Sequence, residues 1–486
     1  MPQNQEMPEM NAYLWYCHDL AITYPDTITW PGEDQFVAEQ QDYFSRQQSE
    51  LSPACFYRPF DELQLSYAVA RVKIHPLCPI AVKGGGHASF AGASNTAKGI
   101  TIVLRHFDQV TPSADKRTVR VGAGNRWRNV YQELERFNLT VTGGRTGSVG
   151  VGGFTLGGGI SFFSGLYGLS CDNVANYRAI LANGSILDVN RNSQPELYWA
   201  LRGGGSNFAI VTHFEMYAIP HAYMWGGTRN YTKQWIPRLI DFYVESGFLA
   251  SSQPSASQIT TLYYRDGEYT ATVDLFNVNP EPSDMLFNTT LPQVPYTSDT
   301  LAITRQSQLA ESNYLGQPDG LRQTYWTATY LLDQALAHFI HQVFEEETAA
   351  LGPLDDLEAR CIMQIFANNT LQAMTKNGGN ALPIAGGEQP VIILNPAFRW
   401  QQASDDLKIL QANQNLFTRV KHYARERALN VDYLYMPYAS EFQNVLETYG
   451  PKNLDRLRQV ASTYDPEGFF QTQTPGYFKL NGRVGW

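Results

Sequence analysis

The chain has 486 residues, which is long enough for two or three domains with large cores. Hydrophobic residues make up 43% of it and charged residues 17%, a composition that excludes a disordered protein. The net charge of −10 and the pI near 5.4 argue against a nucleic-acid partner, because no basic surface is available to meet phosphates.

The cysteines are odd in number, widely spaced and without a C-x-x-C pair; they are Cys17, Cys55, Cys78, Cys171 and Cys361. This pattern predicts buried free thiols rather than a disulfide framework or a zinc site. The N-terminal residues carry neither the basic nor the apolar segment of a signal peptide, and no apolar run reaches the length of a membrane span. We therefore expect a soluble, cytoplasmic protein without a membrane partner.

The first 218 residues alternate short helical and strand-like patterns. Residues 1–50 are polar, which predicts a loosely ordered arm with a helical stretch over 34–48. Helical spacing of apolar residues follows at 65–72 and again at 127–134. Strands are expected at 53–59, 79–82, 100–104, 119–121, 179–181, 185–188 and 209–212. This mixture indicates an α+β domain built around a ligand.

Two glycine-rich segments stand out in this region. The strand at 79–82 runs directly into Lys83, three glycines and His87. Consecutive glycines permit positive φ angles, and their amides can form a nest for an anion such as a pyrophosphate, although a plain tight turn has the same pattern. The second segment, 143–159, interleaves glycines with large apolar residues and so differs from a flexible linker. Together they indicate backbone packed tightly against a large flat ligand.

Beyond residue 218 the glycine clusters stop and longer amphipathic elements begin. Asp266-Gly267 lies between two strand-like runs and predicts a hairpin. Helical periodicity at 332–343 and 404–420, with apolar strands at 361–366 and 391–394, indicates an antiparallel sheet with helices on one face. The last segment holds a tyrosine-rich stretch, 433–438, and a predicted helix over 454–460.

In combination, these motifs resemble the FAD-linked oxidases of the vanillyl-alcohol oxidase/p-cresol methylhydroxylase superfamily, in the berberine bridge enzyme-like branch of fungal type. The matching segments run in order through most of the chain; they are 82–87, 148–153, 156–159, 167–174, 197–208 and 464–466. The resemblance implies an α+β fold, with a two-part FAD-binding domain of the p-cresol methylhydroxylase type and an inserted substrate domain of antiparallel sheet plus helices. The expected boundaries are 1–218 for the FAD-binding domain, 219–430 for the substrate domain and 431–486 for a C-terminal segment that returns to the FAD domain.

The resemblance implies that His87 forms a covalent bond to the 8α carbon of the flavin, which would retain the cofactor and raise its reduction potential. Many relatives carry a second link through a cysteine. Thr146 stands at that position, and Cys171 lies too far along the chain, so we expect a single link and a core position for Cys171. The residues expected to bind FAD are Lys83, Gly84, Gly85, Gly86, His87, Ala88, Thr146, Ser148, Val149, Gly152, Gly153, Gly158, Val211 and Tyr435.

Three further residues bear on the chemistry. In the resembled family a valine at the position of Val149 accompanies access of O₂ to the reduced flavin. Tyr435 and Tyr438 are the candidate catalytic residues, as base or substrate orienter. Because the pKa of a phenol is about 10, a tyrosine base needs a neighbour that stabilises its phenolate. The family pattern Tyr-x-Asn-Tyr has Pro437 in place of its asparagine here, which removes amide donors from the site.

The expected function is oxidation of a small organic molecule, with a natural-product intermediate as the expected substrate, by hydride transfer to covalently bound FAD; O₂ then reoxidises the flavin and gives H₂O₂. Carbohydrate oxidation, a redox-neutral cyclisation with structural FAD, a flavin carrier and a nicotinamide-dependent reductase are the alternatives. His338 and His341 lie three residues apart on a predicted helix, but no third ligand accompanies them, so no metal is expected.

Overall fold

The computed structural model describes residues 9–72, 78–282, 286–287, 294–352, 354 and 356–482. The extreme N-terminal residues, on which the expected location depends, lie outside these ranges. None of the helices within the described ranges combines the length and the hydrophobicity that crossing a bilayer requires.

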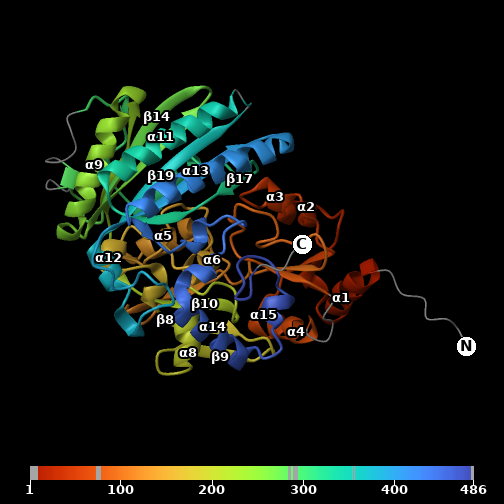
Figure 1. The fold of residues 1–486 in the computed structure, drawn as a ribbon. Helices are drawn as coiled ribbons and strands as arrows, with labels where there is room; N and C mark the ends of the chain where they lie inside the picture. The colour runs from red at the N-terminus through yellow and green to blue at the C-terminus, as the bar shows by residue number, and fades with distance from the viewer. Residues whose placement is uncertain are drawn as a thin grey trace, which may run out of the picture.

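Buried hydrophobic side chains form two main cores. The first is built mainly from residues 16–216 and 433–480, joined by side chains from 366–393, and the second lies within 231–424. Figure 1 shows the C-terminal helices α14 (Gly450–Tyr464) and α15 (Phe469–Thr472) among elements of the N-terminal half. The C-terminal segment therefore packs with the first core, while the domain boundaries at 218 and 430 stay predictions.

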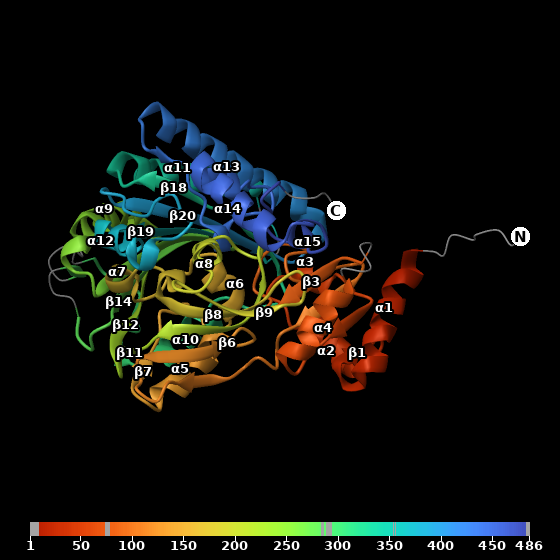
Figure 2. The same cartoon turned by 90° about the horizontal axis from the view of Figure 1, so that it is seen from below.

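The first core contains two sheets, which lie beside each other in the view from below (Figure 2). The four-stranded sheet has the order β1-β2-β4-β3, and its last pair is parallel. The five-stranded antiparallel sheet has the order β5-β6-β10-β8-β9. Their strands are β1 (Ile28–Thr29), β2 (Cys55–Tyr57), β3 (Ile80–Lys83), β4 (Ile100–Val103), β5 (Val110–Pro112), β6 (Thr118–Gly122), β8 (Val174–Ile180), β9 (Ile186–Asn190) and β10 (Ile210–Tyr217).

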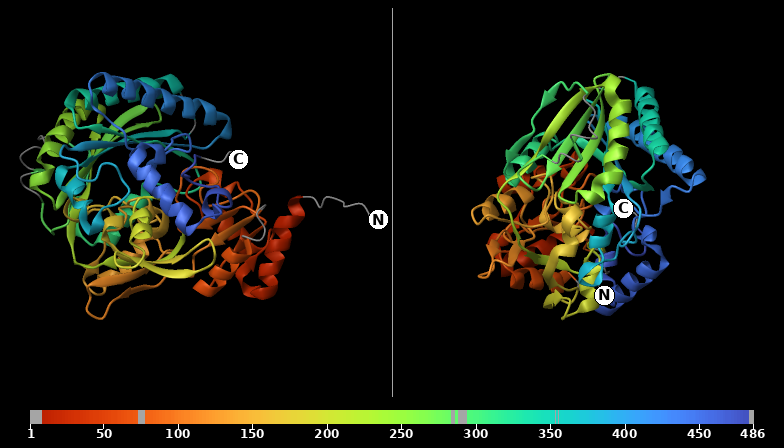
Figure 3. Two further views of the ribbon diagram at one scale, coloured as in Figure 1. Left: turned by 60° about the horizontal axis from the view of Figure 1, so that its bottom comes forward. Right: turned by 90° about the vertical axis from the view of Figure 1, so that its left-hand side faces the viewer.

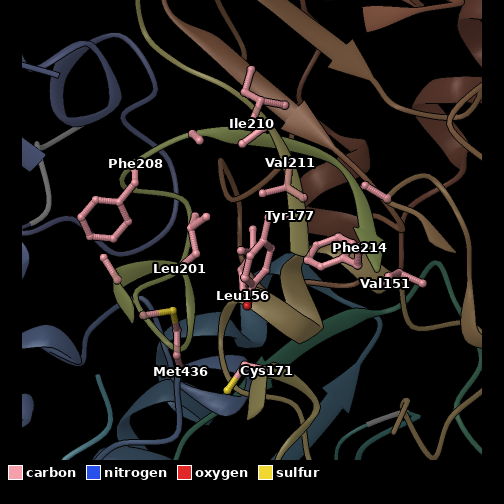
Figure 4. Packing of buried hydrophobic residues seen from close by; sticks show 14 of the residues in the cluster. Val151, Leu156, Cys171, Tyr177, Leu201, Phe208, Ile210, Val211, Phe214 and Met436 are labelled. Carbon is pink, nitrogen blue, oxygen red and sulfur yellow. The ribbon is translucent and has the colours of Figure 1, made fainter. Parts of the chain in front are cut away.

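Helices pack on these sheets through the apolar faces that the spacing predicts. Leu65, Val69 and Val72 of α4 are all fully buried. Figure 4 shows Leu156, Val211 and Met436 within one apolar cluster that also holds Cys171, so Cys171 is a core residue as expected. The helices are α2 (Asp34–Gln41), α3 (Arg46–Ser49), α4 (Glu62–Val72), α5 (Trp127–Glu135), α6 (Val151–Leu156), α7 (Ser164–Tyr167) and α8 (Pro195–Leu201).

The second core lies under a large sheet of ten described strands, antiparallel throughout its main path. Alternate residues point to a helix-covered face and to the first core; α9, α11 and α13 cover the outer face (Figures 1 and 3). The principal elements are β12 (Met224–Thr232), α9 (Ile236–Leu249), β13 (Ala256–Arg265), β14 (Glu268–Asn277), α10 (Gln306–Leu315), β17 (Arg322–Tyr325), β18 (Ala328–Leu331), α11 (Gln334–Leu351), β19 (Glu358–Phe366), α12 (Asn368–Ala373), β20 (Val391–Trp400) and α13 (Asp406–Glu426). The α+β prediction is confirmed.

The N-terminal arm differs from its prediction. Instead of loose chain, α1 (Glu9–Thr23) packs Tyr16, Cys17 and Leu20 into the first core with no exposed surface. Cys17 forms a disulfide with Cys55 of β2, with a Cα–Cα distance of 6.2 Å. The prediction of five free thiols is therefore wrong. The sequence did not indicate this pair, because the two cysteines are 38 residues apart, the total number of cysteines is odd, and only tertiary packing brings the two together.

The disulfide predicts a thiol count. Reaction of the unreduced, denatured protein with a thiol reagent should detect three thiols, those of Cys78, Cys171 and Cys361. The paired substitution Cys17→Ser and Cys55→Ser should lower the free energy of unfolding by about 2–4 kcal/mol, because the open chain regains loop entropy. Cys78→Ser is the matched control for loss of one buried sulfur. Detection of five thiols would contradict the bond.

Candidate active site

A cavity of about 490 Å³ lies between the glycine-rich loops of the first core and the inner face of the large sheet. Its size is in the range of binding sites for small molecules and cofactors. The C-terminal segment, including Tyr435 and Tyr438, closes a further side. The cavity therefore joins three parts of the chain that are remote in sequence.

The two glycine segments lie back to back beside the cavity. A Cβ atom on Gly85 would lie 2.4 Å from Gly150 Cα, and one on Gly150 would lie 2.4 Å from Gly85 N. Neither residue can carry a side chain while the loops keep this spacing. The close approach fixes the loop after β3 against the loop that starts α6.

Charged side chains hold this arrangement from behind. Arg126 donates to the carbonyl of Gly85 at 3.2 Å and to Asp42. Lys83, which is 1% exposed, turns away from the cavity and donates to Glu39, with Asp42 at 3.4 Å. Its side chain therefore does not line the cavity as a cofactor ligand would.

His87 follows the glycines at the cavity wall. Its ring stacks on Phe44 at 4.1 Å between centroids, and its Nε2 lies 3.1 Å from Ser148 Oγ. Burial, reinforced by the nearby Arg126 cation, lowers the pKa of His87 to about 4. The imidazole is therefore neutral near pH 7. A neutral imidazole keeps one unprotonated ring nitrogen, which can act as a nucleophile.

Most of the other predicted FAD ligands also line the cavity: Gly84, Gly85, Gly86, Ala88, Thr146, Val149, Gly152, Gly153, Val211 and Tyr435. Ser148 instead lies behind His87. Gly158 has a φ of +120° and packs against Tyr435: a Cβ atom added to this glycine would lie 3.5 Å from the tyrosine ring. Among the described residues no cysteine lines the cavity.

Tyr435 and Tyr438 meet edge to face with ring centroids 4.8 Å apart, and they differ in environment. The Tyr435 hydroxyl accepts from the backbone N–H of Ile160 at 2.9 Å, and burial raises its pKa well above the ordinary value. The Tyr438 hydroxyl accepts from Arg145 Nη2 at 3.2 Å and from Gln364 Nε2 at 3.3 Å. One of these donors is a cation, which is the stronger kind of partner for an oxyanion.

Arg145 and Gln364 were missed by sequence reasoning. Arg145 also donates to the Gln364 side chain, and Asn313 holds its backbone carbonyl at 2.8 Å. The one local signal was an arginine inside a glycine-rich loop, and nothing in the sequence indicated that Gln364 of β19 faces it.

The sheet contributes a polar wall. Its cavity-facing residues alternate along the strands and stand opposite one another, as Thr228 does with Asp274 and Tyr263 with Arg360. Thr228 donates to Asp274 at 2.5 Å, and burial raises the pKa of Asp274 to about 6. The polar residues of this wall are Thr228, Asn230, Thr261, Tyr263, Thr272, Asp274, Arg360, Gln364 and Asn395.

The two histidines considered as metal ligands contact carboxylates instead: Asp241 lies on the neighbouring helix α9, and Glu345 lies one turn along their own helix α11. His338 Nε2 lies 2.9 Å from Asp241, and His341 Nε2 lies 3.3 Å from Glu345. Within the described ranges, no group of three or more His, Cys, Asp or Glu side chains is placed to hold a metal ion.

Comparison with known proteins identifies the class. Residues 53–190 match the model of an FAD binding domain. The FAD-dependent monooxygenase tpcD of Cochliobolus heterostrophus is 34% identical over 492 residues, covering 96% of this chain and 94% of the relative. Among solved structures, a berberine bridge enzyme variant in complex with (S)-reticuline has a TM-score of 0.77 at 17% identity, covering 97% of this chain and 99% of that one. A chitooligosaccharide oxidase has a TM-score of 0.74 at 16% identity, covering 97% and 100%.

The chain therefore belongs to a family of FAD-binding oxidoreductases that includes these fungal FAD-dependent monooxygenases, and its fold is that of the berberine bridge enzyme-like structures. The cavity fits FAD on its own evidence. A Cβ on Gly153 would meet nothing within 4 Å, so this glycine opens onto the space that a ligand can fill. The amides of the Gly84–Gly86 loop add the donors that a diphosphate needs.

Two glycine substitutions should separate folding from cofactor binding. Gly85→Ala forces apart the two loops and should lower the free energy of unfolding of the apoprotein by about 1–3 kcal/mol. Gly153→Ala lies on α6 and should leave apoprotein stability unchanged or raise it by up to ~1 kcal/mol, while its methyl group reduces flavin occupancy. Thermal unfolding of the apoproteins and flavin absorbance per polypeptide measure both. Full flavin occupancy in Gly153→Ala would show that this glycine does not face the cofactor.

Proposed function

We propose that the protein is an oxidase that removes a hydride and a proton from a small organic substrate. The observation that carries this proposal is the Tyr438 hydroxyl, held by Arg145 and Gln364 at the cavity where the glycine loops and the polar sheet meet. Bound FAD would supply the two-electron chemistry: a hydride leaves the substrate carbon for the flavin, and O₂ finally takes up two electrons and two protons as H₂O₂.

Tyr438 is the proposed general base. Its base form is the phenolate, which Arg145 stabilises; the phenolate oxygen takes the proton of the substrate and becomes a neutral phenol. Tyr435, whose buried hydroxyl has a backbone amide as its donor, stays protonated and orients the substrate or the flavin. The two candidate tyrosines thus receive different roles from their surroundings.

His87 is the proposed site of a single covalent link to the flavin. The lowered pKa keeps the ring neutral, so one ring nitrogen has a lone pair for the attack, and the Ser148 hydroxyl contacts the ring at Nε2. Thr146 lines the cavity where many relatives have the second, cysteine link. Val149 also lines it, in keeping with access of O₂ to the site.

The proposed substrate is a natural-product intermediate that carries several oxygen atoms. Nine polar side chains face the cavity from the sheet, so this wall offers hydrogen-bond donors and acceptors to an oxygen-bearing molecule rather than an apolar surface. Asp274 can accept a hydrogen bond from a substrate hydroxyl. The same wall favours a second candidate, a carbohydrate, and the chitooligosaccharide oxidase has a similar fold.

The relatives named monooxygenases set an alternative outcome. A monooxygenase transfers an oxygen atom to its substrate and needs an external reductant, whereas the proposed reaction needs O₂ alone.

The disulfide bears on the location of the protein, because such bonds persist in oxidising compartments and are rare in the cytosol. It favours an oxidising compartment over the expected cytoplasmic one.

The covalent link can be tested by acid precipitation. Flavin fluorescence should stay with denatured wild-type protein and leave His87→Ala, because this variant lacks the imidazole that attacks the flavin. Ser148→Ala is the control: it keeps the imidazole and should retain linked flavin. Flavin that remains on His87→Ala would contradict the assignment.

The pH dependence of flavin attachment follows from the lowered pKa of His87. The neutral imidazole persists below its ordinary titration range, so attachment of FAD to apoprotein should proceed at a constant rate down to pH about 5 and slow below pH about 4. The measurement is the fraction of acid-stable flavin against time. A rate that falls near pH 6.5 would show an unperturbed histidine.

The base assignment predicts unequal effects of two tyrosine substitutions. Tyr438→Phe should slow anaerobic flavin reduction about 10²–10⁴-fold, and Arg145→Met should slow it less. Tyr435→Phe is the matched control and should keep most of the rate. The test substrates are panels of hydroxylated aromatic alcohols and reducing oligosaccharides. With each of them, H₂O₂ formation and O₂ consumption are measured in the absence of NADPH. A larger loss in Tyr435→Phe would reverse the roles, and a strict need for NADPH would overturn the oxidase.

A further inference from the structure

Lys479 is a buried cation in the wall of the cavity, at the end of the described chain. Its residue is 4% exposed. Its Nζ donates to Thr474 Oγ1 at 3.3 Å and to the Ser206 carbonyl at 3.4 Å. Both partners are neutral, and both distances are near the limit of a hydrogen bond. Within the described ranges, no carboxylate forms an ion pair with it at 4.0 Å or less.

The other buried lysine of this region shows what a paired site looks like. Lys83 Nζ lies 3.2 Å from Glu39 and 3.4 Å from Asp42, and it lies over the ring of Tyr43. Asp465 raises the pKa of Lys479 through its charge, but the Asp465 carboxylate accepts hydrogen bonds from the N–H groups of Phe469 and Phe470. Lys479 therefore has the desolvation cost of burial without a close counter-charge.

The cations that line the cavity are Arg145, Arg360 and Lys479. Arg360 pairs with Glu358, and Arg145 is held by Gln364 and Tyr438 at the sheet. Lys479 instead lies beside Ser206 and Thr474, in the part of the cavity formed by residues of the first core. Burial lowers the pKa of Lys479 to about 7, against the raising influence of Asp465. A bound anion would restore the full positive charge.

We infer that Lys479 binds an anionic group of FAD. FAD brings permanent negative charge to this cavity in its diphosphate, and the reduced flavin ring can add another. The backbone amides of the glycine loop offer partial charges to an anion, whereas Lys479 offers a full one. The C-terminal segment thus contributes Lys479 to the cofactor site, although this residue belongs to neither glycine-rich segment.

The test uses a non-covalent background, because covalent attachment would hide affinity. In His87→Ala, freed of its FAD, Lys479→Met should weaken binding of oxidised FAD at least about tenfold, the effect of losing one charge-assisted hydrogen bond. Lys479→Arg should restore most of the affinity. The salt dependence of binding should be smaller in Lys479→Met, since one charge contact is gone. Fluorescence titration with FAD measures all three.

Two sources of the anion give different results. Loss of affinity for oxidised FAD identifies the diphosphate. Unchanged affinity for oxidised FAD with a lower flavin reduction potential identifies the reduced ring. Unchanged affinity and unchanged potential would overturn the inference.

A separate readout distinguishes binding from a structural role. Because Lys479 lacks a counter-ion, apoprotein of Lys479→Met should unfold at the same temperature as its parent or higher. A second measurement needs no change at Lys479: near pH 8, FAD binding to the His87→Ala apoprotein should take up protons, as shown by calorimetry in buffers of different ionisation enthalpy. Binding without proton uptake would contradict the inference even if the lysine variants failed to fold.

Discussion

The contact on which the site depends is between two glycines. Gly85 and Gly150 approach so closely that a Cβ on either would overlap the backbone of the other. This approach aligns the loop that carries His87 with the loop that carries Ser148, and it brings the two side chains within 3.1 Å. Arg126 strengthens it through the Gly85 carbonyl. A packing constraint between two backbones thus orients the residue proposed to hold the flavin.

Much of this arrangement was predictable because its signals are local. Glycine runs, His87 and the apolar strands before them occupy short stretches whose residue types dictate backbone geometry. The same reasoning placed an antiparallel sheet with helices on one face in the middle of the chain, as the structure has it. The apolar face of α1 was missed, since its flanking residues are polar and its disulfide partner lies 38 residues away.

The environment of the tyrosines was beyond sequence reasoning for a physical reason. Arg145 and Tyr438 are 293 residues apart, and Gln364 lies on a strand between them in the chain. The contact among these three side chains depends on how the large sheet packs against the first core.

The two faces of this sheet carry different residues because side chains alternate along each strand. One set packs under α9, α11 and α13, and the other set forms the polar wall of the cavity. Changes on the polar face can therefore alter recognition while the helix-covered face keeps the fold.

The place of the C-terminal segment has a consequence for the order in which the protein matures. The amide of Ile80, the first residue of β3, donates to the carbonyl of Gln473 at 2.7 Å, and Gly476 packs against the carbonyl of Gly92. A chain emerging from the ribosome offers its glycine loops first, whereas the segment that holds Tyr435, Tyr438 and Gln473 follows later in the sequence. The complete cofactor site can therefore form only after this segment has been synthesised and has packed against β3, so flavin loading follows translation of both halves of the site.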